Sequence, residues 1–346
     1  MRRVTHLPDR RDARRDYRRS VSTPTELDAP LATPPTGRLA RWARPALVAN
    51  LVAQIGIVVT GGLVRLTGSG LGCSTWPQCE PGQFAPELHA ATSIHPYIEF
   101  GNRTLTGVLV VVAALVVLTV WPDRTRAKSF RLLALAPLAG VLLQAVIGGI
   151  TVLVDLHPAV VGGHMLISLA LIAVSMLLLH RAGEGDGPPL RVVHPAAWIG
   201  ARVTAVVAVP MLVLGVIVTG AGPHSGDEEV GYRFAVDPAL MARFHALSVW
   251  LFVLALVATC WYLWRHPAPA GARRASLTLL ALTVAQGVVG YVQYFAGLPI
   301  ALVAIHMLGA GVVTAAAVWF VLTTRERGVL VEAEAEAIAD DEDATA

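Results

Sequence analysis

The chain has 346 residues, of which 55% are hydrophobic and only 15% are charged, and its mean hydropathy is +0.60. Soluble domains carry about 25% charged residues, so this composition excludes an ordinary soluble protein. The formal net charge of +3 is small, and no nucleic acid is expected as a partner.

Residues 1–45 form a polar arm that contains eleven arginines and no lysine. Its composition predicts a disordered segment, and its charge suits anionic lipid headgroups. No short apolar core follows the arginines directly, so we do not expect a cleaved signal peptide.

Eight apolar stretches follow, each about 20 residues long, which is the length that crosses a hydrocarbon core as a helix. Only helices or closed barrels satisfy their backbone groups in lipid. We therefore predict an all-α integral membrane protein with eight transmembrane helices. The expected spans are residues 46–66, 98–121, 131–154, 158–180, 197–220, 241–264, 274–295 and 299–323.

The loops between these spans alternate in charge. Arginine or lysine occurs in loops 122–131, 181–196 and 265–274, whereas loops 67–97 and 155–157 contain neither. The positive-inside rule then places both termini in the cytoplasm, with the helices in the cell membrane. The acidic end, 324–346, is predicted to be a solvated cytoplasmic tail.

The first outer loop contains the sequence GLGCSTWPQCEPG with Cys73 and Cys79. An outer loop faces an oxidising compartment, where a disulfide is chemically allowed. Two unpaired thiols remain the alternative. The spacing is too long for a CxxC redox motif or a c-type heme attachment motif.

The two halves of the chain repeat each other. Gln144 precedes His164 by 20 residues, and Gln286 precedes His306 by the same number. VVTGG at the end of the first span also resembles IVTGAG at the end of the fifth. Parallel repeats are a known membrane architecture. We expect two pseudo-symmetric four-helix bundles, 46–180 and 197–323, joined by a cytoplasmic linker, 181–196.

The repeat pairs the second span with the sixth and sets Asn102 against His245, within one residue. Asn102, His164, His245 and His306 then form a layer below the outer surface. A histidine inside a membrane is costly unless it is paired or functional. Two facing imidazoles in one bundle, here His245 and His306, can hold both axial positions of a heme iron. The first half sets His164 against Asn102, a poor iron ligand, which predicts a looser or partly open heme site.

The stretch IEFGNRTLTGV, residues 98–108, adds Glu99 and Arg103 beside this open site. A carboxylate in a purely structural membrane helix would be expensive, so the position favours a functional role. Arg103 and Arg65 can pair with anionic heme propionates. Arginines that extend to the membrane interface are the alternative.

Together these residues resemble the heme A synthase family, which converts heme O to heme A for terminal oxidases. The matching pieces are GGLVRLTGSGLGCSTWPQC, IEFGNR, GGHM, RFHA and AIHM, within residues 46–323. The resemblance implies heme b bound by His245 and His306 in the second half. It implies heme O as the substrate, bound through His164, with Glu99 as the catalytic carboxylate. It also implies a disulfide between Cys73 and Cys79.

The reaction implied by the resemblance is oxidation of the heme C8 methyl to a formyl group by two hydroxylations. The implied partners are an electron donor such as a quinol, heme O synthase and oxidase assembly factors. The chain departs from the family at Asn102, where many members have a histidine, so we do not carry that ligand role over. We expect a five-coordinate or differently liganded substrate heme; His95, expected in the preceding loop, is the alternative ligand.

Two other functions stay open from the residues alone. A di-heme b-type cytochrome would only pass electrons; it would keep both histidine pairs and would not need Glu99. A transporter would usually have broken helices and polar groups at mid-membrane, whereas here the polar groups lie near the outer ends of the spans.

Overall fold

The computed structural model describes residues 40–328, except for 88–92, 225, 228 and 230. Most of the arginine-rich arm and of the acidic tail lie outside the described residues. Within the described part, eight helices are long and apolar enough to cross a membrane. This confirms the prediction of an all-α membrane protein with eight spans.

The first bundle is a closed ring in which α2 contacts α3 and α6, and α5 contacts α3 and α6. A short 3-10 helix, η1 (Ala40–Trp42), precedes it, and α4 (Lys128–Leu133) continues into α5 as one span. The second span begins earlier than predicted, because Pro96 occupies the first helical turn, where its missing N–H costs nothing. The four helices are α2 (Ala43–Leu66), α3 (His95–Val120), α5 (Ala136–Leu153) and α6 (Pro158–Arg181).

The second bundle is a ring of the same kind, in which α8 contacts α7 and α9, and α10 contacts α9 and α7. Proline begins α7 and α8, and Asp237 caps α8 by accepting hydrogen bonds from the N–H groups of Ala239 and Leu240. The helices are α7 (Pro195–Ala221), α8 (Pro238–Arg265), α9 (Ala270–Phe295) and α10 (Ile300–Leu322).

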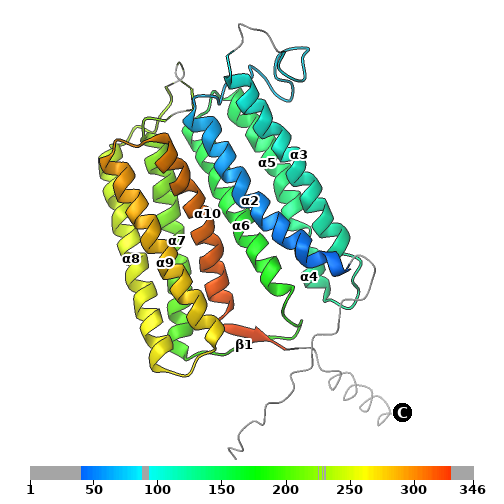
Figure 1. Ribbon diagram of the computed structural model, residues 1–346, viewed down its shortest axis with the longest axis vertical. Coiled ribbons are helices and arrows are strands. Elements are labelled where there is room, and N and C mark those ends of the chain that lie inside the picture. The colour runs from blue at the N-terminus through cyan, green and yellow to red at the C-terminus, as the bar shows by residue number, and fades with distance from the viewer. Residues whose placement is uncertain (1–39, 88–92, 225, 228, 230, 329–346) are drawn as a thin grey trace, which may run out of the picture. The chain divides into compact units, whose positions relative to one another are not determined.

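The two bundles join through the first and last helices of each half. Helix α10 contacts both α2 and α6, and α6 also contacts α7; Figure 1 shows α2, α6 and α10 beside one another, with α3 and α5 on one side and α8 and α9 on the other. Val58, Ile172 and Ala315 form a small apolar core at this junction. The bundles therefore share a packed wall.

The pattern of burial reproduces the repeat and fixes its register. Residues buried in α3 and α8 are separated by 143 positions, in the pairs Leu109/Phe252, Ala113/Leu256, Val116/Thr259 and Val120/Leu263. Asn102 and His245 have the same separation. Asn102 and His245 were predicted to correspond within one residue, and in the structure they correspond without any shift.

The first and fifth spans align differently from the prediction. Buried pairs in α2 and α7, Leu47/Ala201 and Asn50/Thr204, are separated by 154 positions. VVTGG and IVTGAG are separated by 159, so their likeness is not the structural equivalence. Gly61 corresponds instead to Gly215. The difference arises because local sequence likeness does not record which helix face is buried.

The helix ends near residues 181–196 are called the linker side here, and the opposite ends, near the disulfide loop, the loop side. On the linker side, β1 (Pro189–Arg191) pairs antiparallel with β2 (Arg325–Arg327). The first residues of the predicted tail therefore pair with the predicted linker.

Asp186 connects three segments on the linker side. Its carboxylate accepts hydrogen bonds from Arg126 at 2.9 Å, Arg181 at 3.2 Å and the Ala127 N–H at 2.8 Å. Burial acts to raise the pKa of Asp186, but the hydrogen bonds and the two arginine charges outweigh it, so the pKa lies below its usual value.

Candidate functional site

A cavity of about 400 Å³ lies in the loop-side half of the helices and is lined by residues of both bundles. The four positions of the predicted layer, Asn102, His164, His245 and His306, all line it. The site residues Glu99, Arg103 and Arg65 line it as well. The structure therefore brings these seven residues together in one cavity.

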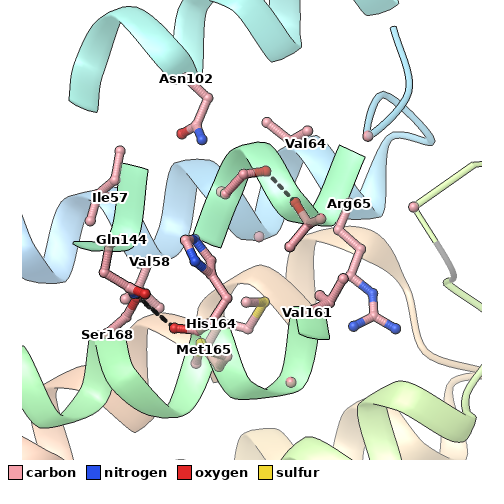
Figure 2. Close-up of a pocket in the computed structure, with 18 of the residues that line it drawn as sticks. Ile57, Val58, Val64, Arg65, Asn102, Gln144, Val161, His164, Met165 and Ser168 are labelled. Carbon is pink, nitrogen blue, oxygen red and sulfur yellow. Dashed lines mark hydrogen bonds between the residues drawn. The ribbon is translucent and has the colours of Figure 1, made fainter. Parts of the chain in front are cut away.

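His164 and His306 occupy repeated environments. Gln144 Nε2 donates to the backbone oxygen of His164 at 2.8 Å (Figure 2), and Gln286 Nε2 donates to that of His306 at 2.6 Å. In each case a glycine on the glutamine's helix leaves room for the ring: a Cβ at Gly148 would lie 3.5 Å from His164 Cε1, and one at Gly290 would lie 3.2 Å from His306 Cε1.

The ring nitrogens of these two histidines are available. Nδ1 of His164 and Nδ1 of His306 are buried and have no hydrogen-bond partner within the described residues. Buried polar atoms are normally satisfied, so such atoms call for a ligand or another explanation. Both rings therefore suit a bound metal centre.

His245 is oriented by α7. Its Nδ1 lies 3.0 Å from the carbonyl oxygen of Met211, which can only accept, so Nδ1 carries the proton and Nε2 has a free lone pair. The ring centres of His245 and His306 are 6.5 Å apart, with an angle of 79° between the planes. Two metal–nitrogen bonds of about 2 Å each, plus the two ring radii, need about this separation. The pair therefore fits one metal atom between two imidazoles.

Asn102 lies opposite His164 across the cavity, and Figure 2 shows its amide pointing toward the imidazole. Thr60 Oγ1 donates to Asn102 Oδ1 at 2.9 Å, which leaves the N–H groups of the amide for the cavity. A Cβ at Gly61 would lie 3.8 Å from Asn102 Nδ2, whereas one at Gly215 would lie 3.1 Å from the larger His245 ring. The first bundle thus keeps open space where the second has an imidazole.

Glu99 is buried, with 5% of its surface exposed. Its carboxylate accepts from the Cys73 N–H at 2.7 Å and from Arg103 Nε at 3.1 Å. Arg103 also donates to the carbonyl oxygens of Thr75 and Gln78. The loop between α2 and α3 therefore holds both members of the Glu99–Arg103 pair.

The predicted disulfide between Cys73 and Cys79 is present, and both cysteines are fully buried. It closes the loop that contacts Glu99 and Arg103. Trp76 of the same loop packs against Gly149 of α5 and lines the cavity. The loop is thus a wall of the site.

Arg65 reaches from α2 to the second bundle. It donates to the carbonyl oxygens of Thr219 and His224, each at 2.8 Å. Gly70 N–H also donates to the Gly226 oxygen at 2.8 Å. The loop-side ends of the two bundles are therefore hydrogen-bonded to each other directly beside the cavity.

The expected position of His95 in the loop is wrong. This residue is the first of α3 and not part of the loop, its Nδ1 lies 2.8 Å from Ser69 Oγ, and it does not line the cavity. Polar or aromatic cavity residues that the sequence analysis did not single out include Trp76 and Gln54. The sequence did offer one sign for Gln54, because a polar amide side chain stands in the middle of an apolar span.

Comparison with known proteins supplies a family. The model of the family described as COX15-CtaA, cytochrome oxidase assembly protein, matches residues 44–234, more than half of the chain. Similar curated proteins are named heme A synthase. Those of Bacillus pumilus and Oceanobacillus iheyensis are 30% and 33% identical over 141 and 140 residues, 40% of this chain and 44% of each relative. That of Lysinibacillus sphaericus is 33% identical over 153 residues, 42% of this chain and 47% of the relative. The chain thus matches about half the length of these curated relatives.

Proposed function

Because the chain belongs to the COX15-CtaA family of cytochrome oxidase assembly proteins, we propose that it is a heme A synthase, which oxidises the C8 methyl group of heme O to a formyl group. One observation carries the proposal most directly. A single cavity contains an imidazole facing an open side and a buried carboxylate in one bundle, and a pair of facing imidazoles in the other.

The second bundle suits a resident heme b. His245 and His306 would supply the two axial nitrogens, and a heme with two strong ligands supplies electron transfer without an open position for substrate. The Met211 carbonyl fixes the tautomer of His245. Gln286 holds the α10 backbone at His306, which keeps that ring in place.

The first bundle suits heme O as the substrate. His164 would hold the iron from one side, while Asn102 offers amide N–H groups and no metal-binding nitrogen on the other. A substrate held by one strong ligand can leave after reaction. The two halves would then divide the work between retention of heme b and turnover of heme O.

Glu99 would act on the protons of the reaction. Each hydroxylation oxidises the methyl carbon by two electrons: with oxygen from water it releases two protons and two electrons, and with dioxygen and a two-electron donor it consumes two protons and also forms water. Two hydroxylations on the same carbon give a geminal diol that loses water to leave the formyl group. A carboxylate beside the methyl can accept or donate these protons or stabilise developing positive charge. Arg103 and the Cys73 N–H fix the position of this carboxylate.

Arg65 and Arg103 also line the loop-side end of the cavity, and a bound heme would direct its propionates toward them. Arg65 uses Nε and Nη2 for backbone contacts, so its Nη1 is the group that would meet a propionate. The propionates would then lie on the loop side and the opposite porphyrin edge deeper in the bundle.

We also propose a cellular location and a set of partners. The charge of the loops supports a cell-membrane protein with the linker side and both termini in the cytoplasm. A quinol is the class of electron donor we favour, and heme O synthase and oxidase assembly factors are the expected neighbours in the pathway.

The test is co-expression with a source of heme O, followed by purification, acid–acetone extraction and mass analysis of the hemes. The chain should yield heme A or its hydroxylated precursor together with heme B. Glu99→Gln should yield no product while keeping heme B. Glu80→Gln is the matched control, since Glu80 lies in the same loop and bonds Ser74 outside the cavity. Heme B alone from the unchanged protein would point to the di-heme cytochrome instead.

A further inference from the structure

Gln54 of α2 has a buried amide nitrogen without a hydrogen-bond partner within the described residues. Only 2% of its surface is exposed, and its Nε2 contacts no acceptor within the described residues. It lines the cavity. Leaving a buried donor unsatisfied costs about 1–3 kcal/mol, more than enough to favour leucine at this position if the residue had no ligand.

The side-chain amides near Gln54 differ from it, because their nitrogen atoms have hydrogen-bond partners. Asn50, one turn earlier on the same helix, donates to Ser175 Oγ at 2.8 Å. Gln144 uses its Nε2 for His164 and Ser168, but its Oε1 is buried and has no partner within the described residues. On the first bundle's side, the cavity therefore has a buried unused amide donor, Gln54 Nε2, and a buried unused amide acceptor, Gln144 Oε1; Gln293 of the second bundle also has a buried Oε1 without a partner within the described residues.

Position 54 lies below the level of the predicted iron ligand. Gly61 faces Asn102, and Gln54 is seven residues earlier, which is two helical turns and so the same face of α2. At 1.5 Å per residue it is about 10 Å closer to the linker side. A porphyrin with its propionates toward Arg65 and Arg103 would direct its opposite edge to this depth.

That edge is where heme O and heme B differ. Heme O has a hydroxyethylfarnesyl group where heme B has a vinyl group. The hydroxyl is both a donor and an acceptor, and in a membrane interior it needs partners for both roles. The second bundle, proposed to hold heme b, has Ala208 at the position equivalent to Gln54 in the register of α2 and α7. It has no amide there to meet such a hydroxyl.

We propose that Gln54 is a specificity-determining residue that recognises the hydroxyl of the hydroxyethylfarnesyl group of heme O. Its Nε2 donates to the hydroxyl oxygen, and the hydroxyl donates to Gln144 Oε1. Heme B in the same place leaves both amide atoms unpaired, so the first bundle disfavours it. This inference rests on the proposed function.

The test compares heme selection, not turnover. The full chain and its Gln54→Leu variant are purified in detergent and incubated with equal amounts of heme O and heme B, and the bound hemes are extracted and counted per chain. After one heme B per chain is subtracted for the heme b proposed in the second bundle, the ratio of the remaining heme O to heme B should fall roughly tenfold in Gln54→Leu, the scale of one buried hydrogen bond. Asn50→Leu is the control, because its amide is satisfied by Ser175; it should keep the ratio of the unchanged chain.

A second measurement separates recognition from structure. Leucine removes an unpaired buried donor, so the heme-free Gln54→Leu protein should unfold at a higher temperature than the unchanged protein. Gln54→Met repeats the test with an unbranched side chain if leucine prevents folding. An unchanged heme ratio in a folded variant overturns the inference. Failure of the proposed function looks different, because the unchanged chain would then take up no heme O or form no heme A.

Discussion

The glycines beside the histidine rings allow a sharp test of the predicted heme ligation. A methyl group at Gly215 would lie 3.1 Å from Cε1 and 3.4 Å from Nδ1 of His245, so the imidazole would have to move by a few tenths of an ångström. The ring is not free to move without loss, because its Nδ1 is hydrogen-bonded to Met211 of the same helix at 3.0 Å. Gly215→Ala should therefore displace the ring away from α7 and stretch this bond.

We expect the stretched bond to weaken ligation by about 1 kcal/mol, or roughly fivefold in heme b affinity. Gly61→Ala is the matched control at the equivalent position of the first bundle, where the new methyl would lie 3.8 Å from the Asn102 amide, an ordinary contact. The assay is the visible and EPR spectrum of the bound heme b, with heme content per chain. An unchanged low-spin spectrum and full heme content in Gly215→Ala would refute the assignment of His245 as a ligand held by α7.

Three further changes test other parts of the site. Asn102→His should turn the substrate heme from a high-spin to a low-spin spectrum and slow heme A release, since Gly61 leaves room for a ring; a spectrum that stays high-spin contradicts the open face. Cys73→Ser should lower heme A formation severalfold, because without the disulfide the loop that contacts Glu99 and Arg103 is less firmly held. Heme b content is the control and should stay unchanged. Full heme A formation by this variant would contradict the prediction. The low pKa of Asp186 contributes stability above about pH 4, which is lost as the pH falls further. Asp186→Asn should therefore lower the free energy of unfolding at pH 7 by about 1–3 kcal/mol, measured as a lower unfolding temperature. An equal loss of stability below pH 4 in both proteins would argue against the contact.

The sequence alone predicted the spans and the residues of the layer, because apolar length and polar exceptions within it are local properties. Position 102 paired correctly with 245 because both helices keep one register of buried residues. The pairing of VVTGG with IVTGAG failed because two helical segments can share a sequence and still bury different faces.

The remaining features depend on contacts between distant segments. The anchoring of Glu99 by the Cys73 N–H and the reach of Arg65 into the second bundle arise only after loops far apart in sequence meet. His95 was misplaced because Pro96 is compatible with either a loop or the first turn of a helix. Gln54 was overlooked because one amide in an apolar span resembles ordinary polar tolerance until its lack of partners is known.

The small strand pair on the linker side has a consequence for engineering. Because β2 follows the last helix and pairs with the segment between the bundles, the chain's two halves are fastened at that end by a non-covalent clasp. A protein cut open within residues 192–194, so that β1 stays with the first piece, and produced as two polypeptides should therefore reassemble less completely when the second piece lacks Arg325–Arg327. Shortening the chain before Arg325 would keep every membrane span and still remove the clasp.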